Sequence, residues 1–238
     1  MNAKGFTLIE MILTIIVGGI LVLGLAGFVE FGMKGYSDTV ERQRLHTQAR
    51  FILEKMSREI RHSVPNIVRD DIVETGADSC VSFYPIDYSG FYAVEGSDIE
   101  FLVGHSGVAS SSVIDAEKYL IINPTNSSDT ANAYSLVSRT VSVSGTTYTI
   151  SGGASTLGSQ SVADRQYIYS SEVSYCIDNS NGWITRNGVQ VAENVSSGSF
   201  EYLAANLQRG GLVHVTLLLA QDGEQSNYQQ DIQVLNVP

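Results

Sequence analysis

Cationic side chains are scarce in this chain. It carries 14 lysines and arginines against 25 aspartates and glutamates, and its formal net charge is −11. Nucleic acid binding needs clustered cations that face phosphates, so the sequence predicts no nucleic acid partner. The charge is also unevenly spread, because residues 6–69 are net +2 and residues 70–238 are net −14.

Cysteine is rarer still, and no pair of cysteines lies close together in the sequence. Cys80 and Cys176 form no CxxC motif, which argues against a zinc site and against a thioredoxin-type centre. A nucleophile elbow, G-x-S-x-G, is not completed after Gly104, because Val108 stands where the last glycine is needed. No phosphate-binding loop or catalytic pair of acids stands out. The sequence therefore predicts no enzyme and no cofactor.

Metal ligands are equally sparse. The histidines are scattered, and we expect each to be a surface or structural residue rather than a ligand; they are His46, His62, His105 and His214. The acid-rich stretch Asp178–Gly182 lacks the spacing of a calcium-binding EF-hand, in which position 12 is an acid, because Val189 stands there. We expect a turn at Asp178–Gly182 and no metal site.

Only 4 prolines occur, whereas glycine, serine, threonine and valine are abundant after residue 75. That composition predicts a β-rich domain with many turns, and strands that follow one another without helices pair antiparallel. The predicted strands are 81–84, 91–94, 99–103, 118–122, 134–143, 146–150, 166–170, 173–177, 183–186, 189–192, 199–204, 212–220 and 231–236. Asn187-Gly188 predicts a two-residue hairpin turn. Residues 123–132 and 151–161 are predicted to be surface loops, the second of them flexible.

The N-terminus, by contrast, carries a long apolar run. Met11–Val29 holds 19 residues without a charge, which is enough for a helix to cross roughly 30 Å of hydrocarbon. One carboxylate, Glu10, lies at its start. An acid at the centre of a membrane helix costs about 2.5–3.5 kcal/mol. A passive anchor has no use for such a group, whereas a helix that pairs with a cationic partner inside the membrane does.

The stretch Gly5-Phe6-Thr7-Leu8-Ile9-Glu10, followed by the apolar run, resembles the class III leader of type IV pilins and type II secretion pseudopilins. The resemblance implies that residues 1–5 are a leader peptide. A prepilin peptidase would cut between Gly5 and Phe6 and methylate the new amine of Phe6. It further implies that Glu10 pairs with the N-terminal amine of a neighbouring subunit during assembly.

Helical periodicity continues beyond the membrane segment. Apolar residues recur mostly every three or four positions, at Tyr36, Val40, Leu45, Ala49, Ile52, Leu53, Met56, Ile60 and Val64. Pro65 ends this pattern, since it disfavours a helical residue before it. We therefore expect an α+β, pilin-like fold: a transmembrane or fibre-core helix over 6–29, an amphipathic continuation over 30–64, and an antiparallel β-sheet head over 65–238 that packs on one face of this spine.

Two features of the spine leave alternatives open. Glycines cluster at Gly18, Gly19, Gly24, Gly27, Gly32 and Gly35. They favour either close helix packing or a segment that unwinds when the subunit leaves the bilayer. Basic residues between 42 and 61 indicate either a solvated face or a surface that docks on an acidic neighbour in a fibre.

The two cysteines fit an exported domain. Both Cys80 and Cys176 lie in strand-like runs, and thiol pairs usually close in an oxidising compartment. We expect a Cys80–Cys176 disulfide; two separate buried thiols are the alternative.

The C-terminal segments 210–220 and 231–238, together with the spine segment 49–61, resemble the group of pseudopilin J and minor pilin W. Within that group, the final Val-Leu-Asn-Val-Pro is most similar to minor subunits of MSHA pilus biogenesis. The resemblance implies a minor pilin at the tip or in the initiation complex of a type IV pilus. One alternative is a type II secretion pseudopilin J. The other, from a different class, is a membrane-anchored adhesin or binding protein.

The same resemblance implies the location and the partners. We expect a single pass through the inner membrane, with a cytoplasmic N-terminus, a periplasmic head and a later place at a pilus or pseudopilus tip. The partners would be the prepilin peptidase, other minor pilins or pseudopilins, and the major pilin.

Overall fold

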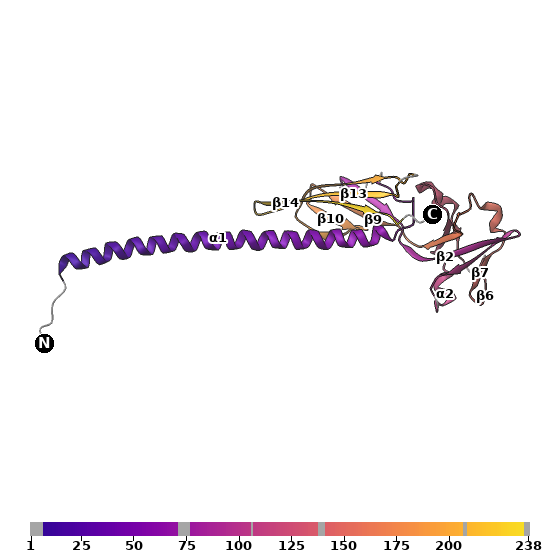
Figure 1. Ribbon diagram of the computed structural model, residues 1–238, viewed down its shortest axis with the longest axis horizontal. Helices are drawn as coiled ribbons and strands as arrows, with labels where there is room; N and C mark the ends of the chain where they lie inside the picture. The colour runs from indigo at the N-terminus through magenta and orange to yellow at the C-terminus, as the bar shows by residue number, and fades with distance from the viewer. Residues whose placement is uncertain (1–6, 71–76, 106, 138–140, 207–208, 236–238) are drawn as a thin grey trace.

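The computed structural model describes residues 7–70, 77–105, 107–137, 141–206 and 209–235. One long N-terminal helix is followed by antiparallel sheets, which confirms the predicted α+β architecture. Figure 1 shows the helix as a rod whose C-terminal half carries one layer of strands, with a second group of strands beyond its end.

Helix α1 spans Leu8–Arg61, 54 residues or about 80 Å. It ends before Val64, where the sequence predicted its end. His62 is its C-cap and donates its backbone N–H to the carbonyls of Glu59 and Ile60. Because Pro65 disfavours the helical conformation of the residue before it, the chain leaves the helix a few residues earlier.

Two small sheets cover the C-terminal half of α1. The four-stranded sheet runs β1-β9-β10-β11, with β1 Ser79–Phe83, β9 Val173–Asp178, β10 Trp183–Arg186 and β11 Val189–Ala192. The three-stranded sheet runs β12-β13-β14, with β12 Val195–Leu203, β13 Leu212–Gln221 and β14 Glu224–Gln233. One hydrophobic core joins both sheets to the helix residues Leu45, Ala49, Ile52, Leu53, Met56 and Ile60. We call this part the proximal head.

A seven-stranded sheet forms the part beyond the end of α1, which we call the distal lobe. Its order is β5-β4-β8-β2-β3-β7-β6. The strands are β2 Ile86–Glu95, β3 Asp98–Val103, β4 Tyr119–Ile122, β5 Tyr134–Ser135, β6 Val141–Ser144, β7 Thr147–Ile150 and β8 Arg165–Tyr169. A short helix, α2 Ser110–Val113, and two 3-10 helices, η1 Ser127–Asn132 and η2 Gly153–Thr156, connect them. The lobe has its own core around Ile99, Phe101, Leu120 and Ile168.

The distal lobe is an insertion in the proximal head. All its strands, β2 to β8, lie in the sequence between β1 and β9, which pair antiparallel with Phe83 opposite Val173. The chain therefore enters and leaves the lobe through neighbouring strands. In Figure 1 this insertion lies at the end of the molecule farthest from the N-terminus.

Several predicted strands differ from the observed ones. The predicted strand 134–143 is divided into β5, which ends at Ser135, and β6, which begins at Val141. The predicted strand 231–236 overlaps only the last residues of a longer strand, β14, which begins at Glu224, ends at Gln233 and forms a hairpin with β13. Only Ile232 of β14 is buried, so the sequence lacks the hydrophobic alternation that would have predicted the start of this strand. The predicted Asn187-Gly188 hairpin is confirmed, and both residues have positive φ.

The two predicted loops contain local structure. Residues 127–132 form η1, whose N-cap Asn126 and third residue Asp129 make a capping box. Residues 153–156 form η2, in which Gly153 is buried. Ser161 is also buried and accepts a hydrogen bond from the backbone of Arg165. The prediction of a flexible surface loop over 151–161 is therefore wrong for these positions.

Candidate assembly site

The N-terminal end of α1 places a carboxylate at the start of the apolar helix. Thr7 is the N-cap, and its Oγ1 accepts the backbone N–H of Glu10 at 3.4 Å. Glu10 lies in the first turn, where the helix dipole favours a negative charge. Within the described part of the chain, Glu10 forms no ion pair. Gly5 and Phe6, which the sequence assigns to cleavage and methylation, lie outside the described residues.

The apolar half of α1 has no cover in the monomer. It is long and apolar enough to cross a membrane, and none of its most apolar stretch is buried. Leu8 is 78% exposed, Leu23 is 75% exposed, and the first buried residue of the helix is Leu45. Exposed apolar surface on this scale requires lipid or other protein around it.

The glycines of the spine are not required by contacts inside this chain. The helix runs through Gly18, Gly19, Gly24, Gly27, Gly32 and Gly35 without a break. A Cβ at any of them would meet nothing within 4 Å. Each glycine costs about 1 kcal/mol relative to alanine in an aqueous helix. The presence of six glycines in α1 is therefore explained by an interaction or a motion outside the folded monomer. Close packing against another helix and local unwinding both remain compatible with this geometry.

The head begins well beyond the end of the charge-free run. Two residues of the predicted packing face, Tyr36 and Val40, are 74% and 48% exposed and do not reach the head. They lie with Met33 along an open groove of about 550 Å³ on the helix. The prediction that these residues pack on the head is wrong, because the strands that cover α1 begin only beside residue 42, where Arg42 meets Glu224.

Residues 1–26 match the family model of the prokaryotic N-terminal methylation motif. The matched segment contains the Gly5–Phe6 junction, Glu10 and most of the apolar run. Neither a curated protein nor a solved structure shows significant similarity to the chain.

The prepilin-type motif and the long uncovered helix together support a type IV pilin-like subunit. Such a motif indicates a structural subunit rather than an enzyme. It implies processing by prepilin peptidase, anchoring in a membrane through α1 and assembly with other pilins.

A disulfide joins Cys80 and Cys176, as the sequence predicts. The two residues are direct partners in the β1–β9 register, and both are buried. They close the two strands through which the chain enters and leaves the distal lobe. We call this region the neck.

A polar cluster lies beside the disulfide in the neck. Arg69 and Glu172 form an ion pair at 2.6 Å, and Ser82 donates its hydroxyl to the same Glu172 oxygen at 2.7 Å. The backbones of Arg69 and Ser82 also exchange two hydrogen bonds. The segment that follows α1 is thereby fixed to β1. Sequence reasoning missed this cluster, because its members are far apart in the chain.

The basic residues of the spine have mixed partners. Arg42 pairs with Glu224 at 3.0 Å and Arg44 with Glu193 at 3.4 Å, both within the chain's own head. Glu54 and Arg58 form the expected pair four residues apart at 2.9 Å. In the described residues, Arg50, Lys55 and Arg61 have no ion pair. The first two pairs show that the chain's own acidic head meets part of this basic stripe.

No group of three metal-ligating side chains occurs in the residues that the structure describes. His214 lies 2.6 Å from an Asp231 oxygen, and His62 lies 2.9 Å from the carbonyl of Arg58. Asp178 closes the predicted turn by accepting hydrogen bonds from Ser180 and Asn181. These bonds lower the pKa of Asp178 to about 2, so its carboxylate is ionised and occupied with local donors.

Proposed function

We propose that this chain is a minor pilin of a type IV pilus, of the MSHA type and similar to MSHA pilus biogenesis protein O. It is made as an inner-membrane precursor, cleaved between Gly5 and Phe6, and assembled through Glu10. The observation that carries this proposal is the carboxylate of Glu10, which has no ion pair among the described residues and lies at the start of an uncovered apolar helix, within the matched motif.

Electrostatics gives Glu10 its role. A carboxylate at the edge of hydrocarbon either becomes neutral or pairs with a cation. Cleavage after Gly5 would create an ammonium group on Phe6, only four positions before Glu10 in the sequence. The amine of one subunit and Glu10 of the next would then neutralise each other, and this pairing would set the register between neighbouring helices.

The distal lobe supports a place at the tip. It extends beyond the end of α1, on the side opposite to the N-terminus (Figure 1). If α1 lies along the fibre axis with its N-terminus toward the membrane, the lobe occupies the space directly above the spine. A subunit with this shape suits the end of a filament, where no other subunit has to be added above it.

The test is the substitution Glu10→Ala, with Glu10→Gln as the variant that keeps the size of the side chain. Both are expected to remove the chain from purified filaments while leaving its amount in the inner membrane unchanged. Mass spectrometry of the wild-type protein in filaments should find a methylated Phe6 at the N-terminus. Normal incorporation of Glu10→Ala, or a chain in filaments that still begins at Met1, would refute the proposal.

The match to residues 1–26 and the uncovered helix fit a type II secretion pseudopilin J equally well. Deletion of the gene discriminates between the two, since loss of surface pili with normal secretion supports the pilin and the reverse supports the pseudopilin. Glu10→Ala also distinguishes the pilin from a simple membrane-anchored adhesin, because the substitution would leave the binding activity of such an adhesin intact.

A further inference from the structure

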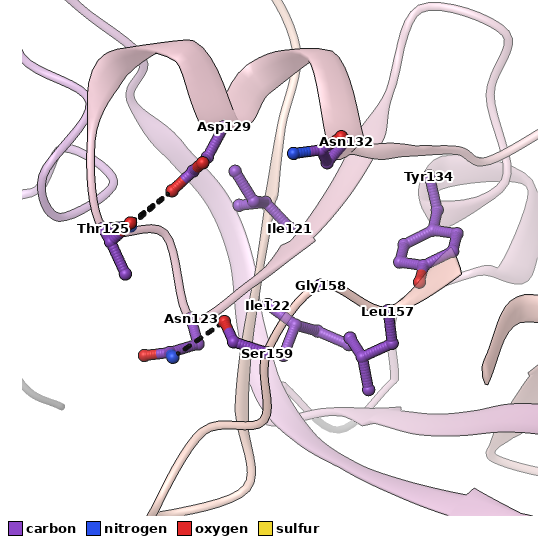
Figure 2. A pocket seen from close by; sticks show the side chains of 10 residues that line it. All are labelled: Ile121, Ile122, Asn123, Thr125, Asp129, Asn132, Tyr134, Leu157, Gly158 and Ser159. Carbon is purple, nitrogen blue, oxygen red and sulfur yellow. Dashed lines mark hydrogen bonds between the residues drawn. The ribbon is translucent and has the colours of Figure 1, made fainter. Parts of the chain in front are cut away.

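The distal lobe contains a small polar pocket that the assembly function does not use. It lies between the end of β4, η1, β5 and the loop after η2, and its volume is about 260 Å³ (Figure 2). This is below the roughly 300–1,000 Å³ of pockets that hold drug-sized ligands. Its occupant is therefore small, of the size of one sugar ring.

The pocket combines an apolar side with polar groups. Ile121, Ile122 and Leu157 supply the aliphatic surface, and the ring of Tyr134 forms one wall. Amide and hydroxyl groups complete the lining at Asn123, Asn132 and Ser159. Such a mixture suits a ligand with both C–H faces and many hydroxyls, because apolar contact supplies affinity and a few polar groups fix orientation.

Hydrogen bonds within the lobe hold the lining in place. Asn123 has a φ of 46°, in the left-handed region, and its Nδ2 donates to Ser159 Oγ at 3.0 Å. Tyr134 donates its hydroxyl to the carbonyl of Gly153 at 2.9 Å. The pocket thus needs little reordering to receive a ligand, which lowers the entropic cost of binding.

Part of the polar lining remains available. In the described part of the chain, the side-chain amide of Asn132 forms no hydrogen bond, and Figure 2 shows it at the rim of the pocket. Ser159 accepts a hydrogen bond from Asn123, and its own O–H donates to no group among the described residues. An amide with both a donor and an acceptor, beside a hydroxyl donor, matches neighbouring hydroxyls of a sugar.

Charge decides between ligand classes. Among the described residues, the lining contains no lysine, arginine or histidine, so an anionic ligand would find no cationic partner there. Asp129 is the one acid, and its oxygens already accept from the backbone and hydroxyl of Thr125 and from the backbone and amide of Asn126. Burial raises the pKa of Asp129, but these hydrogen bonds outweigh it and the net shift is downward. The Asp129 carboxylate therefore has a structural role as a helix cap, and little of its coordination capacity remains for a cation.

We propose that this pocket binds a neutral pyranose unit of a glycan. Asn132 and Ser159 would hydrogen-bond its hydroxyls, while Tyr134 and Leu157 would contact its C–H face. A single ring in a pocket of this size is expected to bind weakly, with a Kd on the order of 1 mM, so several copies or a longer glycan would be needed for adhesion.

The test uses the full chain in detergent and a panel of methyl pyranosides of neutral hexoses and N-acetylhexosamines. Ligand-observed NMR reports which members bind. We expect Asn132→Ala and Ser159→Ala each to weaken binding by about twofold to tenfold. The exposed Asn227 of β14 provides the matched control, and Asn227→Ala should change nothing. An unchanged thermal midpoint in each variant confirms that the lobe is folded.

Charged analogues complete the design. Pyranosides with a ring carboxylate should bind more weakly than their neutral counterparts. The proposal is wrong if no neutral pyranoside binds the folded chain at tens of millimolar. It is also wrong if N-acetyl amino acid amides or the acidic sugars bind better, or if binding is unaffected by both Asn132→Ala and Ser159→Ala. None of these results depends on filament assembly, so the proposed pilin function is tested separately.

Discussion

At the scale of single residues, Gly90 is a position where only glycine fits. A Cβ built there would lie 1.8 Å from the carbonyl oxygen of Leu102 on the paired strand β3. The distance is far inside van der Waals contact, so any other side chain forces β2 and β3 apart. Gly90 therefore sets how closely the central strands of the distal lobe approach.

We expect Gly90→Ala to destabilise the distal lobe by at least about 2 kcal/mol, because the backbone itself must move. Hydrogen exchange of the full chain should show faster exchange in β2 and β3, with β13 and β14 unaffected. Gly158, where a Cβ would meet nothing within 4 Å, provides the control. Equal protection in Gly90→Ala and Gly158→Ala would contradict this account.

At the scale of elements, α1 has two faces with different roles. Met56 is completely buried against the proximal head, whereas Phe51 is 62% exposed. We expect Met56→Ala to lower the free energy of unfolding by about 2–5 kcal/mol, since it leaves a cavity in the core. Phe51→Ala should change it by less than about 0.5 kcal/mol. Urea unfolding in detergent measures both, and similar losses in the two variants would contradict the assigned faces.

The disulfide is the second element with a measurable contribution. It closes a loop with a sequence separation of 96 residues, for which removal of the crosslink typically costs about 2–5 kcal/mol. The double variant Cys80→Ser, Cys176→Ser should show this loss in urea unfolding. Wild-type protein refolded under reducing conditions should behave like the variant. An unchanged unfolding midpoint in both samples would show that the pairing of β1 and β9 suffices alone.

Local patterns predicted the elements that have a strong local signal. The spine follows from the spacing of Ile52, Met56 and Ile60, all of which are buried. The turn at Asn187-Gly188 follows from residues that tolerate positive φ. Only the end of strand β14 was predicted. Its residues alternate between partly exposed and exposed, most of them are polar, and only Ile232 is buried.

The arrangement of elements was not readable from the sequence. Phe83 and Val173 are neighbours in a sheet although a whole lobe separates them in the chain. The predicted Cys80–Cys176 disulfide brings the two runs together, but nothing in the sequence gives their antiparallel register, because that is determined by non-local packing. The pocket had a fainter signal: the Asn126 to Asp129 spacing is that of a capping box, which marks the start of η1 within a stretch that otherwise reads as a loop.

At the scale of the whole molecule, the chain is a pilin-like body with one inserted lobe. Since β1 and β9 are antiparallel partners, a short turn could join them directly. We expect a variant in which residues 86–169 are replaced by a Gly-Ser turn to keep the proximal head folded and the Cys80–Cys176 bond formed. Circular dichroism and a free-thiol assay measure this. If the variant lacks fixed tertiary structure, or if its cysteines react as free thiols, the lobe is needed for folding of the head.

The position of the disulfide has a mechanical consequence. If a surface holds the distal lobe while α1 is held in a fibre, tension enters the proximal head through β1. The sulfur bridge passes part of that tension to β9, and from there to β10 and the rest of the sheet. Strand β1 cannot then be peeled away alone, so under a strong pull the lobe would unravel inside its closed loop before the body that bears it comes apart.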